Sequence, residues 1–214
     1  EDGYEDSFYL QLIGNIRKYK GVKEDPLPAQ SKTIDIRYDL SQWNDIMNVY
    51  RDIGRENYER NSAGVTRSLI YKQRAPRNNL QEIKVTHDEK NIYFHIHSED
   101  AISLCEGKGN WMNILIGTGK PQLKGWESYE YRIYREPDDN GATTVERLRE
   151  DFSAEMVGEA LYIISGNIIQ FQIPRQLIGL PNSAGEQSFY FKVADEVEKP
   201  EHIMSYYTSG KSLP

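Results

Sequence analysis

The feature that most constrains the fold of this chain is an alternation of apolar and polar residues in short runs, repeated from Thr33 onward. β-branched and aromatic residues dominate these runs, and Gly, Pro, Asn or Asp bounds them, which is typical of strands with one buried face. Successive side chains of a strand point to opposite faces, so alternation implies one apolar side. The predicted strands are residues 33–38, 66–73, 80–87, 91–98, 111–117, 127–135, 143–148, 160–165, 168–173 and 188–194.

The spacing of these runs favours an antiparallel arrangement. Turn residues at 87–91 and at 165–167 lie between two strand-like runs each and predict hairpins. Ten short strands with few helical patterns between them favour an all-β, antiparallel two-sheet sandwich over alternating strand–helix units. Short helical turns are predicted only at residues 41–48 and 174–179.

The region before Thr33 has a different pattern. Residues 7–19 carry apolar side chains at three- and four-residue spacing, which predicts a short amphipathic N-terminal helix. Residues 21–32 are polar with two prolines, as linkers are. We therefore divide the chain into residues 1–31, helix and linker, and residues 32–214, the sandwich.

The chain begins at Glu1 without an initiator Met or an apolar signal stretch. We expect either that a targeting segment has been removed or that this is a piece of a longer protein. The N-terminal helix is then the remnant of an upstream domain, or else it packs on the sandwich.

Composition excludes several classes of partner. The chain has 26 Lys and Arg against 33 Asp and Glu, a net charge of −7, whereas a nucleic-acid binder needs a basic stripe. No apolar run approaches the roughly 20 residues of a membrane-spanning helix. The single cysteine, Cys105, excludes an internal disulfide and a multi-cysteine metal site.

Motifs for catalysis or metal binding are weak. Residues 117–120 read Gly-Thr-Gly-Lys but lack the spacing of a phosphate-binding loop, and no nucleophile elbow occurs, so we expect no enzyme activity in this chain. His95 and His97 lie two apart on a predicted strand and share a face. A metal site there needs a third ligand, such as His87 or His202; the alternative is a solvated strand face.

Aromatic and polar residues near the middle of the chain suit a sugar site. Trp111 and Trp126 flank a short connection, and Asn113, Arg132 and Tyr134 lie on the adjoining predicted strands. Aromatic rings stack on the C–H faces of sugars, and planar polar groups bond their hydroxyls. The alternative for each tryptophan is the core.

Parity separates these residues from the expected core. Trp111 and Asn113 share one strand face, and Arg132 and Tyr134 share a face of the next strand. The opposite faces carry the residues expected in the core, which are Met112, Ile114, Ile116, Tyr129, Tyr131 and Ile133. A polar face over an apolar interior is therefore predicted.

An ordered series of motifs resembles a known family. Residues 32–43 (KTIDIRYDLSQW) and the hairpin at 83–100 are similar to the opening of family 9 carbohydrate-binding modules and of DOMON-like sandwiches. Residues 7–22 resemble the last helix of the catalytic domain of glycoside-hydrolase-like proteins that carry such a module. The later motifs follow in the family order at residues 111–117, 125–135, 166–179 and 189–197.

The resemblance implies a sugar site on the concave sheet of a non-catalytic, C-terminal module. The family's arginine matches Arg132, its carboxylate falls on Asn113, and its late amide falls on Lys192. Of the family's two enclosing tryptophans, one falls close to Trp111 and the other near Tyr206 or Tyr207. Trp126 stays ambiguous between the sugar site and the core.

The family also implies wider expectations. These are an oligo- or polysaccharide ligand, a covalently linked catalytic domain such as a glycoside hydrolase, a structural calcium ion, and an extracellular or cell-envelope location. Gly117 replaces the acid that usually ends its strand.

Two alternatives stay open. DOMON-like domains also hold haem, which would need a Met and His pair. The candidates are Met112, Met156 and Met204 with His95, His97 and His202. The second alternative is a structural spacer whose sugar site has decayed, which the residues at 113 and 117 favour.

Overall fold

Antiparallel strands dominate the structure, a computed structural model that describes residues 12, 16, 19–20, 29–51, 60–63, 70–73, 78–104, 111–118, 129–151, 153–182 and 187–197. Within these residues the elements are η1 (Leu40–Trp43), β1 (Val49–Arg51), β2 (Arg60–Ala63), β3 (Ile70–Gln73), β4 (Leu80–His87), β5 (Asn91–Ser98), β6 (Trp111–Gly117), β7 (Tyr131–Pro137), β8 (Ala142–Leu148), β9 (Ala154–Ser165), β10 (Ile168–Pro174), η2 (Arg175–Ile178) and β11 (Tyr190–Val197).

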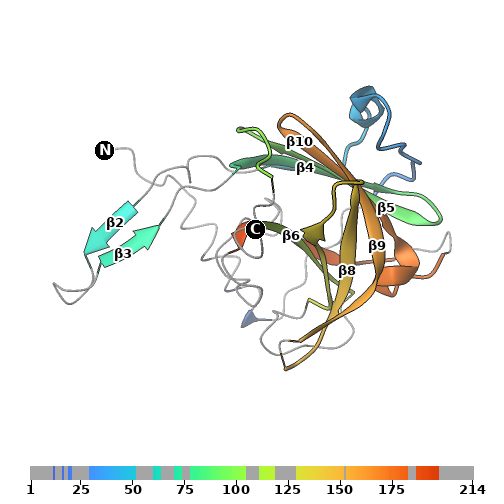
Figure 1. The fold of residues 1–214 in the computed structure, drawn as a ribbon. Helices are drawn as coiled ribbons and strands as arrows, with labels where there is room; N and C mark the ends of the chain where they lie inside the picture. The colour runs from blue at the N-terminus through green and yellow to red at the C-terminus, as the bar shows by residue number, and fades with distance from the viewer. Residues whose placement is uncertain are drawn as a thin grey trace.

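Nine of these strands form one sheet in the order β1-β4-β5-β10-β9-β8-β7-β6-β11, and β2 and β3 pair separately. Every strand pairing is antiparallel (Figure 1). The predicted all-β antiparallel class is therefore confirmed. A single curled sheet supplies the two layers of the sandwich.

Contacts between distant strands of this order show how the sheet curls. Phe191 of β11 packs on Tyr50 of β1 and on Phe94 of β5, with ring centroids 4.9 and 5.2 Å apart. Tyr134 of β7 packs on Phe171 of β10 at 4.8 Å. The two ends of the sheet therefore face each other across one main core, and we call the side of each strand turned away from this core the outer face.

Strand parity predicted most of this core. Met112, Ile114, Ile116, Tyr131 and Ile133 all belong to the main core. The expectation for Tyr129 is wrong, because this residue precedes β7 and packs with Leu115 and Leu148 in a separate cluster.

The two predicted hairpins are confirmed. In the β4–β5 turn the amide of Asp88 bonds the carbonyl of Asn91 at 3.0 Å. In the β9–β10 turn Ser165 pairs directly with Ile168, which leaves Gly166 and Asn167 as a two-residue loop.

The prediction of a strand at 33–38 is wrong. Ile34 and Ile36 are buried and alternate with exposed residues, as in a strand. They lie over a sheet face rather than beside a sheet edge, and the side chain of Gln42 bonds both the amide and the carbonyl of Asp35. Alternation reports one-sided burial, which a chain crossing a sheet produces without a strand partner.

Residues 30–48, which we call the strap, lie over a face of the sheet, and the first residues of the strap bond β4. Thr86 Oγ1 donates to the carbonyl of Gln30 at 2.6 Å, and Ser31 forms an isolated bridge with His87. The strap turns at Asp35–Tyr38, where the amide of Tyr38 bonds the carbonyl of Asp35 at 3.0 Å, and then forms η1, where Asp39 accepts from the amide of Ser41 at 3.0 Å.

Only three residues of the predicted N-terminal helix, Leu12, Ile16 and Tyr19, are described. Positions 12, 16 and 19 are helical, and the amide of Lys20 bonds the carbonyl of Ile16 at 2.9 Å. Leu12, Ile16 and Tyr19 are 55%, 43% and 92% exposed.

Candidate functional site

Four polar side chains lie in register on the outer face of β6, β7, β8 and β11. Leu115 stands opposite both Lys192 and Arg132, and Arg132 stands opposite Glu146. Asn113 lies two residues before Leu115 on β6 and therefore shares its face. We call Asn113, Arg132, Glu146 and Lys192 the polar layer.

The sequence places this layer by simple alternation. The intervening positions of the same strands point into the main core and are apolar, so the polar residues must take the other face. These core residues are Met112, Ile114, Ile133, Val145 and Val193.

The polar layer is buried although it faces away from the core. Lys192 is 3% exposed, Arg132 2%, Asn113 4% and Glu146 9%. Charged groups are rarely buried unless they are paired, because removing a charge from water is costly. The layer is thus shielded from solvent although its side chains do not belong to the main core.

Arg132 and Glu146 form the ion pair at the centre of the layer. Arg132 Nε donates to Glu146 Oε2 at 2.7 Å. Because the guanidinium is a planar fork of donors, a carboxylate at Nε fixes the plane in which the other nitrogens lie. Glu146 therefore positions Arg132.

Asn113 brings an unsatisfied acceptor into the layer. Its Oδ1 is buried and has no hydrogen-bond partner in the described part of the chain. A buried oxygen of this kind costs about 1–3 kcal/mol, so such groups mark places where a ligand hydroxyl or a water could donate.

Apolar side chains lie between the polar ones. Leu115 and Leu148 pack together on this outer face, with Tyr129 and Ala154 against them. The face therefore combines hydrogen-bonding groups with an apolar surface.

The layer reaches the exposed surface at β9. Met156 stands opposite Glu146 and is 55% exposed, and Glu159 stands opposite Thr144 and is also exposed. We call this exposed border of the layer the β9 margin.

The structure brings together three of the predicted site residues, Asn113, Arg132 and Lys192. It does not bring Tyr134 to them. Tyr134 is fully buried in the main core, where it packs on Phe171 and Tyr162. Its φ of 74° and the register shift after Ile133 turn the side chain inward, so the expected alternation with Arg132 is broken.

The side chains of the remaining candidate site residues lie outside the part of the chain that the structure describes. The backbone of Trp111 opens β6, two residues before Asn113, but its side chain is outside the described part. Trp126, Tyr206 and Tyr207 are outside the described residues.

Glu146 is the residue that sequence reasoning missed. Alternation in residues 143–148 puts Thr144, Glu146 and Leu148 on one face, and this signal could have placed it. Its pairing with Arg132 depends on the register of β7 and β8, which alternation does not specify.

The histidine pair does not form a metal site within the described residues. His97 Nε2 lies 3.0 Å from Asn167 Nδ2, and His87 Nδ1 lies 3.4 Å from the carbonyl of Asp88. No group of three or more His, Cys, Asp or Glu side chains in the described part could hold a metal ion.

The candidate haem ligands Met112 and His95 do not lie on the same side of the sheet. Met112 belongs to the main core, whereas His95 lies on an outer face, opposite Lys84 and Gln170. His202 and Met204 lie outside the described residues.

Comparison of the chain with protein-family models and with curated proteins finds no match. In the part of the chain that the structure describes, no helix has the length and apolar character needed to cross a bilayer.

Proposed function

We propose that this sandwich binds carbohydrate and that the polar layer is its sugar-contacting surface. The observation that carries the proposal is the register of Asn113, Arg132 and Lys192, three residues that the family resemblance implies for a sugar site, on one outer face. Their positions in the sequence span 80 residues of chain, and the sheet pairing brings them onto adjacent strands.

The chemistry of this face suits a sugar. Arg132, oriented by Glu146, and Lys192 supply donors, and the carbonyl oxygen of Asn113 supplies an acceptor. Leu115 offers apolar surface to the C–H groups of a pyranose ring. The ligand enters from the β9 margin.

We further propose that the module is non-catalytic and belongs to a secreted or cell-envelope protein that degrades polysaccharides. Binding the glycan would hold a linked catalytic domain close to its substrate and raise the effective concentration. The resemblance supports this context.

Isothermal titration against a panel of neutral and acidic oligosaccharides tests the proposal. The variant Lys192→Met removes a donor from the layer with little change in volume, and Lys90→Met makes the same substitution at an exposed turn position. We expect Lys192→Met to weaken binding about 10- to 100-fold, and Lys90→Met to bind as the wild type does. No binding to any member of the panel, or equal binding by both variants, overturns the proposal.

The burial of the layer favours a second candidate, a structural spacer with a decayed sugar site. All four residues are at most 9% exposed. In that case the panel gives no heat, and the layer has only a structural role.

A further inference from the structure

The strap is held on the outer face of β5, β10 and β9 by apolar side chains. Ile34, Ile36, Trp43 and Ile46 of the strap form a second core with Tyr93 of β5, and Leu161 and Ile163 of β9 pack against it. This second core is small and lies apart from the main one.

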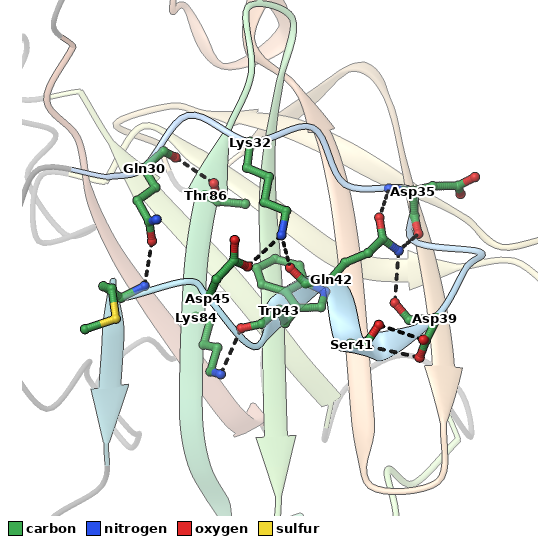
Figure 2. Close-up of polar contacts among 11 residues, drawn as sticks. Gln30, Lys32, Asp35, Asp39, Ser41, Gln42, Trp43, Asp45, Lys84 and Thr86 are labelled. Atoms are coloured by element: carbon green, nitrogen blue, oxygen red, sulfur yellow. Dashed lines mark hydrogen bonds and ion pairs between the residues drawn. The ribbon is translucent and has the colours of Figure 1, made fainter.

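Polar contacts fix Trp43 at the centre of the strap. Its Nε1 donates to Gln170 Oε1 at 2.6 Å, and Gln170 Nε2 donates to the carbonyl of Ile36 at 3.3 Å. Lys84 Nζ donates to the carbonyl of Trp43 at 3.1 Å (Figure 2). Trp43 therefore bonds both β4 and β10, whereas Gln30 and Asn48, at the two ends of the strap, bond β4.

Contacts within the strap hold its shape. Lys32 Nζ bonds Asp45 Oδ1 and the carbonyl of Gln42, both at 2.6 Å, and Gln42 Nε2 donates to the carbonyl of Asp39 at 2.9 Å (Figure 2). These contacts connect the two ends of the strap to each other independently of the sheet.

His95 lies directly beneath Trp43. The two rings are 5.2 Å apart at 46°, and His95 is 7% exposed. Its Nδ1 is buried and has no hydrogen-bond partner among the described residues. This site accommodates a neutral imidazole, because it offers no acceptor for a second N–H at that atom.

The groups around His95 increase the cost of a positive charge there. Lys84 of β4 stands opposite His95, and His97 lies two residues along β5, while Glu82 of β4 acts in the opposite sense. β10 presents the uncharged Gln170, and the strap presents the uncharged ring of Trp43, its charged Lys32 and Asp45 being paired with each other. Burial first, and Lys84 second, lower the pKa of His95 from 6.5 to about 4.

We propose that the strap is an acid-released latch, in which protonation of His95 displaces Trp43 and detaches residues 30–48 from the sheet. Once the strap is released, the imidazole is free to take a proton in water, whereas under the strap it must stay neutral. The sheet itself, with its separate main core, stays folded.

The direction of the effect follows from proton linkage. The docked state binds the proton more weakly than the released state, so acid favours release. Between pH 6.5 and pH 4 the released state is protonated and the docked state is not, so the opening constant rises roughly a hundredfold over this window and levels off below it. Asp39 and Asp45, with pKa values held below 3.8 by Ser41 and Lys32 respectively, act only at lower pH.

Hydrogen exchange of the full chain, corrected for intrinsic rates, tests the latch between pH 7 and pH 4. Peptides from the strap should open about a hundredfold more at pH 4, while peptides from β5 and β6 should not. His95→Phe keeps a ring under Trp43 and should remove the pH dependence; His97→Gln, the matched control, should keep it. Opening of the whole sheet together with the strap overturns the proposal.

A second measurement does not depend on any variant being stable. The indole N–H resonance of Trp43 and the ring protons of His95 can be followed by NMR in the wild type. We expect the indole signal to leave its hydrogen-bonded position as His95 becomes protonated. A Trp43 signal unchanged to pH 4, or an ordinary titration of His95 near pH 6.5 with the strap still docked, overturns the latch.

Discussion

The two outer faces of the sheet bury an amide in opposite ways. On β10, Gln170 accepts from Trp43 and donates to Ile36, so its amide is paired on both sides by the strap. On β6, Asn113 has a buried carbonyl oxygen without a partner among the described residues. The amide of Gln170 therefore joins the strap to the sheet, whereas the buried oxygen of Asn113 is a local cost to stability.

The charges of the two faces differ as well. The strap face keeps its buried titratable group neutral, since burial lowers the pKa of His95. The polar layer buries a charged pair, Arg132 and Glu146, at 2.7 Å. The paired amide of Gln170 therefore stabilises the fold, whereas burying the charges of Arg132 and Glu146 carries a desolvation cost that their attraction must offset.

The largest expected effect is a loss of folding stability from a substitution on the strap face. Trp43→Ala should destabilise the protein by about 4 kcal/mol, because it leaves a cavity in the second core and removes the partner of Gln170. Urea unfolding followed by circular dichroism measures the loss. Tyr38→Ala, at an exposed aromatic on the same strap, should change stability little; an equal loss in both would show that Trp43 does not anchor the strap.

The next largest expected effect is a loss of folding stability from a substitution in the polar layer. Arg132→Met should cost about 3 kcal/mol, because it removes the guanidinium that bonds the buried carboxylate of Glu146, and adding Glu146→Leu should restore most of the loss. The same double-mutant cycle at the exposed pair Arg149 and Glu155 is the control and should show little coupling. Little coupling at both pairs would contradict the buried ion pair.

A smaller effect tests the amide of the strap face. Gln170→Leu should destabilise the fold by about 2 kcal/mol, because the indole N–H of Trp43 is left buried and unpaired. The same unfolding experiment measures it. Adding Trp43→Phe removes the orphaned donor, so the double variant should lose less than the sum of the single losses.

The smallest effect has the opposite sign. Asn113→Leu should stabilise the protein by about 1 kcal/mol, because it replaces an unsatisfied buried oxygen with an apolar group. The same variant should bind sugar more weakly in the titration described above. A loss of stability would show that the amide of Asn113 is already satisfied and would remove the contrast between the two faces.

Sequence alternation predicted the strands that are paired on both sides and buried on their inner face. β4, β5 and β6 begin and end as predicted. β9 extends back to Ala154, well before its predicted start. Alternation did not predict this part of the strand, because it has a register shift near Gly158 and exposed residues where alternation would place apolar ones. Leu177 approaches Gly158 closely enough that a Cβ there would lie 2.7 Å from Cδ2 of Leu177.

The candidate site was predictable in part. Parity placed Asn113 and Arg132 on outer faces, and the register of β6, β7 and β11 then set them beside Lys192. Tyr134 does not share the outer face with Arg132, because its positive φ reverses the alternation within β7. Local rules assume an unbroken strand, and bulges break them.

The amino-acid sequence by itself determined the class of this protein and the direction of most strand side chains, because alternation follows from local backbone geometry. Only the tertiary structure decided which strands are neighbours, that the sheet curls on itself, and that the strap crosses a face instead of joining an edge. Those features arise from contacts between residues far apart in the chain, such as Trp43 with Gln170 and Arg132 with Glu146, whose free energy depends on three-dimensional packing rather than on the pattern of neighbours.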